Sequence, residues 1–427
     1  MSTRVSRWKD LFFWRSIALS ATLGWLILAL PGCGGSGNQT VVLVVTPTAT
    51  PAPTSTPTGT PTPVSPFSAT GSMTTARKSH TATLLASGQV LVVGGRDNNG
   101  NVLASAELYD PTTGKFTATG SMGDSRVSHT AALLADGQVL IAGGQDDSGA
   151  VLATAELYDP GKGTFTLTTA AFPGTGTNMT DSREFHTATT LANGQVLIAG
   201  GQDNASTILA TAELYDPAKG SFVPTTAAFP GTGTNMTDSR ENHTATLFIS
   251  GLLSGRVLIA GGLDKASVVD ATAELYDPAN GSFTATGNMT AAREFETATL
   301  LANQQVLIAG GFGVTDALSS AELFNPATGT FAPTGNLSDA RNLAAATQLE
   351  SGKVLVAGGA DLIGVLNSAD LFDPGANSGA GAFTAAGTMT DFREDFTATL
   401  LSKGQVLLAG GIDDAGNTVA TAELYTP

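Results

Sequence analysis

The chain has little of several residue types that catalysis and folding often use. Only one of its 427 residues is cysteine, Cys33, so no disulfide can form within the chain. All three tryptophans lie within the first 25 residues. Basic residues are also scarce, because 20 lysines and arginines stand against 36 aspartates and glutamates. This balance argues against nucleic acid or anionic lipid as a partner and favours cations, cationic surfaces or neutral ligands such as sugars.

The first 32 residues have the pattern of a signal peptide of the lipoprotein type. A basic segment precedes residues 16–31, an apolar stretch too short to predict a membrane-spanning helix. This stretch runs into Leu30-Pro31-Gly32-Cys33, which resembles a bacterial lipobox, although Pro31 fits the box poorly. An ordinary secretory signal and an uncleaved anchor are the alternatives. We favour lipidation at Cys33 and predict an exported protein anchored through lipid to the bacterial cell envelope or surface.

Residues 33–65 differ in composition from the rest of the chain. They are rich in glycine and serine and then in threonine and proline, and such a segment cannot bury a core. We predict a disordered linker that holds the following residues away from a membrane. Removal of residues 1–32 would leave 16 basic against 35 acidic side chains, a net charge of −19.

Residues 66–427 repeat one unit seven times. A copy has the form R-x-x-H-T-A-T-L-L-A-x-G-Q-V-L-I-A-G-G and then A-T-A-E-L-Y-D-P-x-x-G-x-F-T-A-T-G-x-M, as between Arg126 and Phe165. A period near fifty residues indicates a repeat architecture. The repeat arginines are Arg77, Arg126, Arg183, Arg240, Arg293, Arg341 and Arg393.

Each copy predicts four strands. The segments HTATLL and QVLIA are joined by pairs such as Asp136-Gly137, which suit tight hairpins. ATAELY is the third strand, and an Asp-Pro-x-x-Gly turn leads to a fourth strand that begins at a phenylalanine. A repeated four-stranded antiparallel sheet is the blade of a β-propeller.

The two ends of the repeat region predict how the ring closes. The last copy ends at residues 423–425 with no fourth strand, whereas residues 67–73 form a fourth strand with nothing before it. We therefore predict an all-β fold, a seven-bladed β-propeller of four-stranded antiparallel blades whose ring is closed by the amino-terminal strand.

The glycine pair, the Tyr-Asp, the aromatic residue on the fourth strand and the arginine beyond it resemble kelch repeats across residues 66–427. One difference is systematic: kelch blades usually carry tryptophan on the fourth strand, and this chain carries phenylalanine. Galactose oxidase shares this kind of propeller. Its copper site needs a cysteine–tyrosine crosslink, which cannot be placed here because the sole cysteine is Cys33. Sialidase-type Ser-x-Asp-x-Gly-x-Thr-Trp boxes do not occur either, so we predict no catalytic residue set.

Several polar residues recur at fixed places in the repeat. An acidic residue follows each glycine pair, and its pairing with the repeat arginine predicts a structural ring. The four histidines, His80, His129, His186 and His243, each lie three residues after an arginine. A metal ring is one interpretation. We favour a packed position instead, because Glu296, Ala344 and Phe396 occupy the same slot in the other copies.

The connections that carry the arginines and those after the glycine pairs should emerge on one face of the propeller. We expect this face to hold the insertions at 170–184 and 227–241 and any bound ligand. The candidate residues at its mouth are Glu184, Glu241, Glu294 and Glu394, with Asp97, Asp146, Asp203, Asp264, Asp361 and Asp413. The alternative is a solvated acidic surface whose aspartates start turns. We predict no cofactor, and calcium is the ion that such carboxylates would suit.

Two functions stay open. The first is a monomeric binding or scaffolding module for a glycan, a peptide or an envelope protein. The second is a carbohydrate-active enzyme that uses carboxylates at the propeller mouth. The absence of any histidine, cysteine or tyrosine that breaks the repeat favours the first.

Overall fold

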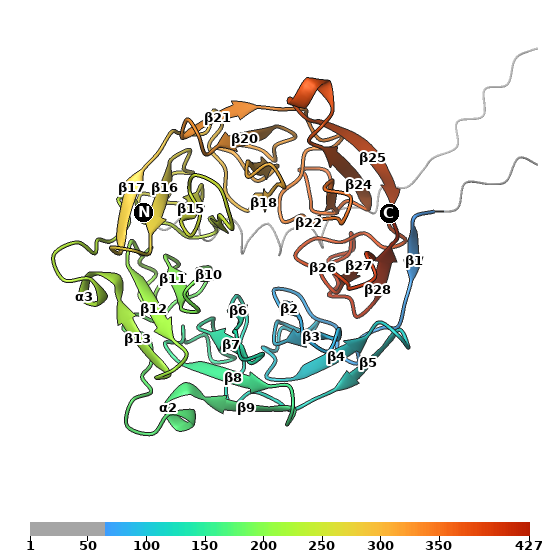
Figure 1. Ribbon diagram of the computed structural model, residues 1–427. Helices are drawn as coiled ribbons and strands as arrows, with labels where there is room; N and C mark the ends of the chain where they lie inside the picture. Colours follow the sequence, from blue (N-terminus) through green and yellow to red (C-terminus); the bar gives the residue numbers. More distant parts are fainter. Residues whose placement is uncertain (1–64) are drawn as a thin grey trace, which may run out of the picture. The chain divides into compact units, whose positions relative to one another are not determined.

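A computed structural model describes residues 65–427 as a ring of seven four-stranded antiparallel sheets (Figure 1). The predicted seven-bladed β-propeller is therefore confirmed. The expected signal peptide, Cys33 and nearly all of the expected linker lie outside the described residues. No helix within residues 65–427 is long and apolar enough to cross a membrane.

The blades are numbered in chain order. Within each blade the first strand lies next to the channel and the fourth strand lies at the rim. The innermost strands are β2 (Thr81–Leu84), β6 (Thr130–Leu133), β10 (Thr187–Thr190), β14 (Thr244–Leu247), β18 (Thr297–Leu300), β22 (Ala345–Gln348) and β26 (Thr397–Leu400). The second strands are β3 (Val90–Val93), β7 (Val139–Ala142), β11 (Val196–Ala199), β15 (Val257–Ala260), β19 (Val306–Ala309), β23 (Val354–Ala357) and β27 (Val406–Ala409).

The outer half of each blade is built in the same way. The third strands are β4 (Ala106–Asp110), β8 (Ala155–Asp159), β12 (Ala212–Asp216), β16 (Ala273–Asp277), β20 (Ala321–Asn325), β24 (Ser368–Asp373) and β28 (Ala422–Tyr425). The fourth strands are β5 (Lys115–Ala118), β9 (Thr164–Leu167), β13 (Ser221–Pro224), β17 (Ser282–Ala285), β21 (Thr330–Pro333), β25 (Ala382–Thr388) and, for blade 7, β1 (Phe67–Ala69).

The core lies between neighbouring blades. All four residues of every second strand are buried, because the apolar VLIA-type sequence is covered on both of its faces. Leu140 of blade 2 and Val196 of blade 3, for example, belong to one cluster of buried side chains. Seven such clusters hold neighbouring blades together by burial of apolar surface.

The amino-terminal strand closes the ring as predicted. β1 pairs with β28 in an antiparallel register that places Phe67 opposite Tyr425. The centroids of these two rings lie 5.0 Å apart, close to the 4.8 Å between Tyr158 and Phe165 in blade 2. The two chain ends of the propeller therefore reproduce the packing of an uninterrupted blade.

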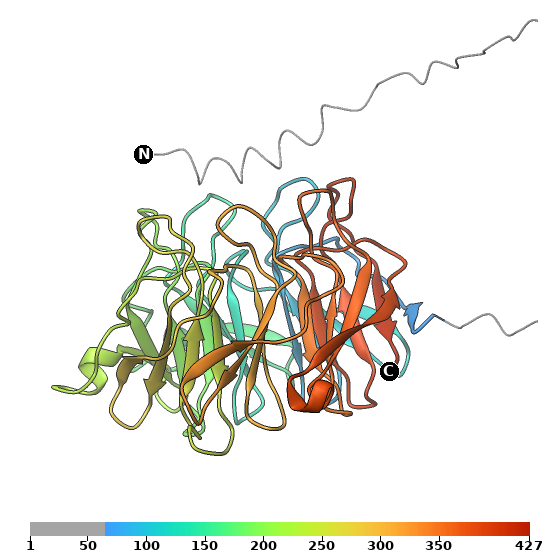
Figure 2. The same ribbon diagram turned by 90° about the horizontal axis from the view of Figure 1, so that it is seen from above.

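The connections fall on two faces of the ring, which Figure 2 shows from the side. We call the loop face the one that bears the connections from the second to the third strand and from the fourth strand to the next blade. The turn face bears the short hairpins between the first and second strands and the Asp-Pro turns between the third and fourth. A short 3₁₀ helix, η1 (Asn377–Gly379), lengthens the Asp-Pro connection of blade 6.

The two insertions were expected on the loop face, but they lie at the outer rim and contact an Asp-Pro turn of the turn face, so this expectation was wrong. They begin with α2 (Thr168–Ala171) and α3 (Thr225–Ala228), which lie on the outer rim (Figure 1). Thr175 Oγ1 donates a hydrogen bond to the carbonyl of Lys219, in the Asp-Pro turn of the next blade, at 2.9 Å. The Phe172 ring lies against Gly220 in that turn, where a Cβ would stand 2.1 Å from it. Contacts with the neighbouring turn thus hold the insertion at the rim.

Candidate functional site

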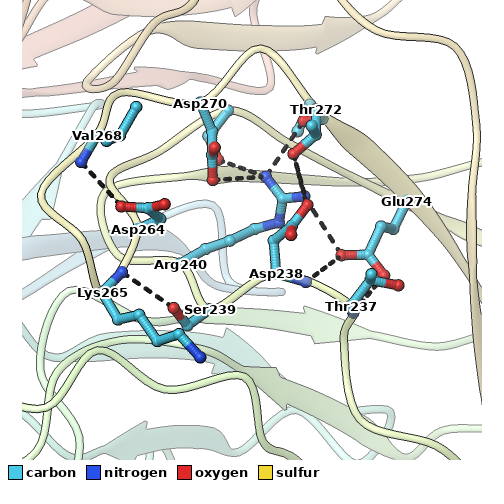
Figure 3. Close-up of polar contacts among 12 residues, drawn as sticks. Thr237, Asp238, Ser239, Arg240, Asp264, Lys265, Val268, Asp270, Thr272 and Glu274 are labelled. Atoms are coloured by element: carbon cyan, nitrogen blue, oxygen red, sulfur yellow. Dashed lines mark hydrogen bonds and ion pairs between the residues drawn. The ribbon is translucent and has the colours of Figure 1, made fainter.

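Each repeat arginine ties a loop-face connection to the outer half of its own blade. In blade 4 the guanidinium of Arg240 donates from Nη1 to the carbonyls of Gly261 and Thr272, at 2.9 and 3.1 Å. Its Nη2 lies 3.3 Å from Glu274 Oε1, and Glu274 in turn accepts from the backbone N–H of Thr237 (Figure 3). The same pairs join Arg77 to Glu107, Arg126 to Glu156, Arg183 to Glu213, Arg293 to Glu322, Arg341 to Asp370 and Arg393 to Glu423.

These ion pairs are buried, and all seven arginine side chains are fully inaccessible. Burial lowers the pKa of Arg126, and the charge of Glu156 opposes that effect. A buried guanidinium stays charged and needs its partner, because a charge left unpaired in the interior is costly. The structure therefore places the arginines within the scaffold, where a ligand in solvent cannot touch them.

Asp270 breaks the repeat, and the sequence analysis missed it. The slot before the third strand holds leucine or valine in the other six blades: Leu103, Leu152, Leu209, Leu318, Leu366 and Val419. Asp270 Oδ2 lies 3.6 Å from Arg240 Nη1 and accepts no hydrogen bond from the described residues. Burial raises the pKa of Asp270 to about 6. Alignment of the seven copies at this slot would have revealed the acid, although not its contact with Arg240 (Figure 3).

A closed ring of backbone hydrogen bonds surrounds the channel at the loop face. Two residues before each innermost strand, one residue of each blade has positive φ, between 50° and 56°. Its N–H donates to the carbonyl of the same residue in the preceding blade, and Ser79 completes the circle by donating to Asp395 at 3.4 Å. The ring residues are Ser79, Ser128, Phe185, Asn242, Phe295, Leu343 and Asp395. This slot holds five different residue types in the seven blades, and its residues surround the mouth.

The histidines lie just below this ring and link neighbouring blades. Nε2 of His129 lies 3.0 Å from Oγ1 of Thr81, in the preceding blade, and the other three histidines repeat this contact. Burial and the charge of Arg126 lower the pKa of His129 to about 3, so the imidazole is neutral. Each Nε2 faces a threonine hydroxyl. Within residues 65–427, no three His, Cys, Asp or Glu side chains are grouped so as to hold a metal ion.

The four mouth glutamates are not a solvated surface. Glu184, Glu241, Glu294 and Glu394 are only 5–7% exposed, because each precedes a ring residue and pairs through its backbone with the start of a loop-face connection. Glu241 Oε2 accepts no hydrogen bond from the described residues. Burial, reinforced by the charges of Glu294 and Glu184, raises the pKa of Glu241 to about 8. The glutamates lie behind the mouth, and three of them occupy successive blades.

The candidate aspartates stabilise their own loops. Asp97 Oδ1 accepts from the N–H groups of Asn99 and Asn101, at 2.8 and 2.9 Å. Asp146, Asp203, Asp264, Asp361 and Asp413 accept in the same way. The interpretation of these residues as turn formers, given above as the alternative, accounts for their contacts.

The chain is similar in sequence to one motif family and in structure to solved propellers. Residues 77–123 and 185–225 match the Kelch motif, and no curated protein sequence shows significant similarity. A fungal alcohol oxidase of the AA5 family, solved in complex with copper, superposes with a TM-score of 0.61 and 20% identity, covering 85% of this chain and 76% of its own. The structure of YjhT superposes with a TM-score of 0.56 and 13% identity, covering 74% and 98%. At these identities the likeness to the solved structures shows the fold alone. The matched motifs and the seven four-stranded blades together show that the chain is a kelch-repeat β-propeller.

Proposed function

We propose that the protein is an exported binding or scaffolding propeller, anchored to the cell envelope through lipid on Cys33, which engages its partner on the loop face. A kelch propeller supports a binding module in general. The Thr/Pro-rich segment at 33–65 would act as the spacer between anchor and propeller. A glycan, a peptide or another envelope protein is the class of partner.

One observation carries the choice of face. Variation among the seven copies gathers on the loop face, in the ring slot at the mouth and in the tips of the connections after the glycine pairs. Five of the six Asp-Pro turns of the opposite face keep the form Asp/Asn-Pro-x-x-Gly, with the longer turn of blade 6 as the exception, and their aspartates cap their own turns, as Asp159 does for Gly161. Residues that vary on a rigid scaffold are those that recognise a partner.

Cross-linking in the source cell tests the proposal. A photoreactive amino acid is placed at Ser148 or Thr315, both exposed on the loop face, and at Lys162 or Lys219, both exposed on the turn face. Adducts should form from the loop-face positions. Adducts that form only from Lys162 or Lys219 would show that the partner binds the other face.

The second candidate is an enzyme that acts on a carbohydrate, and Asp270 is the observation that favours it. A carboxyl group with a pKa near 6, in a slot that is otherwise leucine or valine, suits proton transfer at neutral pH. Turnover of a chromogenic glycoside panel that Asp270→Asn abolishes, and that Asp264→Asn leaves intact, would support this candidate. Unchanged turnover in Asp270→Asn would remove it.

A further inference from the structure

One sector of the loop face carries exposed aliphatic side chains. In blades 4 to 6 the tips of the connections after the glycine pairs present Val268, Val314, Leu362 and Ile363, which are 53%, 63%, 59% and 93% exposed. We call these four residues the apolar sector. In blades 7, 1 and 2 the corresponding tips are polar or small: Asp414-Ala415, Asn98-Asn99 and Asp147-Ser148. The sector therefore spans three adjacent blades and departs from the repeat in each.

The same three blades have lost a link that stabilises the other joints. At four joints, the side chain of a tip residue accepts a hydrogen bond from a backbone N–H of the preceding blade. Asp147 accepts from Val102 at 2.7 Å, Asn204 from Val151 at 3.1 Å, Asp414 from Val365 at 3.1 Å and Asn98 from Thr418 at 3.0 Å. At the joints 3–4, 4–5 and 5–6 the corresponding residues are Lys265, Val314 and Leu362. None of these side chains can accept such a bond.

The loop of blade 5 shows a local substitute for the lost link. The N–H of Ala317, which would meet the side chain of residue 362, donates instead to Oδ1 of the adjacent Asp316 at 3.1 Å. Residue 362 is therefore not needed as a hydrogen-bond acceptor for blade 5. It is a leucine, and its side chain is exposed to solvent. The tip of the blade 6 loop is held by its own hydrogen bonds, because Ile363 N–H donates to Asp361 Oδ1 at 2.7 Å. Ile363 is 93% exposed and lies in the same sector as three other exposed aliphatic side chains, and such a group of exposed apolar side chains is typical of a surface that contacts another molecule.

Charge identifies the kind of molecule. Asp264, Asp316 and Asp361 outnumber the single basic residue, Lys265, in the three connections that carry the apolar sector, and the whole chain has a formal net charge of −16. A second copy of the chain would bring the same charges to the interface, and an anionic lipid surface would be repelled. A basic partner would be attracted, and its aliphatic side chains could cover the sector.

We propose that the loop face of blades 4 to 6 docks a protein segment in which aliphatic and basic side chains alternate. The aliphatic side chains pack on Val314, Leu362 and Ile363, and the basic side chains meet the aspartates of the same loops. This inference rests on the proposed use of the loop face and names its sector and its partner chemistry.

A matched pair of variants tests the docking site. The sector variant combines Val268→Asn, Val314→Asn, Leu362→Asn and Ile363→Ser, each of which introduces a residue that another blade already carries at that slot. The control variant combines Ile249→Asn and Leu252→Asn, which removes side chains that are 72% and 76% exposed on the turn face. Neither variant should melt below the wild type, because no buried contact is lost and the asparagines at 314 and 362 can accept the hydrogen bond that Asn98 and Asn204 accept at other joints.

The probe is a short labelled peptide of alternating lysine and leucine, with lysine–serine and glutamate–leucine peptides for comparison. Fluorescence anisotropy should show that only the lysine–leucine peptide binds the wild type and the control variant, and that the sector variant binds it about tenfold more weakly or worse. Equal binding to the sector variant, equal binding of the lysine–serine peptide, or no binding of the lysine–leucine peptide would overturn the inference. So would sedimentation that shows a wild-type dimer which the sector variant loses. A negative result for the peptide would not by itself remove the loop face as the proposed binding face. Cross-links from Ser148, in the polar tip of blade 2, would still support that face.

Discussion

Replacement of Glu241 by glutamine should make the protein more stable at neutral pH and leave it unchanged in mild acid. Glu241 is 6% exposed, and burial together with the charges of Glu294 and Glu184 raises the pKa of its carboxyl group from 4.5 to about 8. The folded protein therefore holds a proton that the unfolded chain releases above its ordinary pKa. Stability that is fully present below about pH 4.5 is lost as the pH rises toward 8.

The size of this effect follows from the shift. Each pKa unit corresponds to about 1.4 kcal/mol, so the buried group costs about 3 kcal/mol of unfolding free energy at pH 7. Glutamine has nearly the same shape and cannot ionise. Glu241→Gln should thus match the wild type near pH 4.5 and exceed it by about 3 kcal/mol at pH 7.

Urea unfolding measured from pH 4.5 to pH 8 checks the prediction. Glu350→Gln, at an exposed position on the turn face, is the matched control and should follow the wild type at every pH. If the curves of Glu241→Gln and the wild type stay parallel across this range, burial does not set the protonation of Glu241 and the reasoning fails. Glu296, whose pKa burial also raises to about 8, should add to the effect when changed to glutamine in the same protein.

Three further predictions concern the closure, the blade joints and the anchor. Deletion of residues 67–73 should cost several kcal/mol, because the buried ring of Phe67 and the pairing of β1 with β28 are lost, whereas a deletion of similar length within 46–60 should cost almost nothing. Equal melting temperatures of these two variants would refute the role of β1. His243→Ala should cost about 1–3 kcal/mol through loss of its contact with Thr187 Oγ1, and a double-mutant cycle with Thr187→Ala should show coupling; additive losses would contradict the link. Cys33→Ser should abolish labelling by a fatty-acid probe, and a wild type that carries no label would disprove the lipid anchor.

The repeat made most of the fold predictable. Strand order, the number of blades and the closure of the ring could be inferred from the spacing of the glycine pairs and phenylalanines, because this spacing recurs in all seven copies. The place of the insertions depends instead on a contact between distant residues, the Phe172 ring against Gly220 of the next blade. No periodic pattern encodes such a contact, so the sequence supported a wrong position for them.

The candidate site was less predictable for a related reason. Glu184 and its equivalents follow an arginine, so the sequence suggests that they are loop residues. In the structure a single backbone bridge, such as that between Glu184 and Gln202, holds each of them in a buried position. A bridge of one residue pair is too short to leave an alternating pattern. Asp270 and Leu362 could have been found by comparing slots between copies, because each departs from its repeat. The consequence of each departure depends on neighbours in three dimensions, which the comparison does not supply.

The hydrogen-bonded ring around the mouth has a consequence for the chain's own topology. The bond from Ser79 to Asp395 spans the joint where the propeller begins and ends, and it has the same donor, acceptor and backbone conformation as the six bonds that cross continuous joints. At the channel, therefore, the seam is indistinguishable from any other joint. At the channel no blade is distinguished as the first or the last. Circular permutation could therefore move the chain ends of the propeller to the rim of another blade without changing any of the seven hydrogen bonds around the mouth.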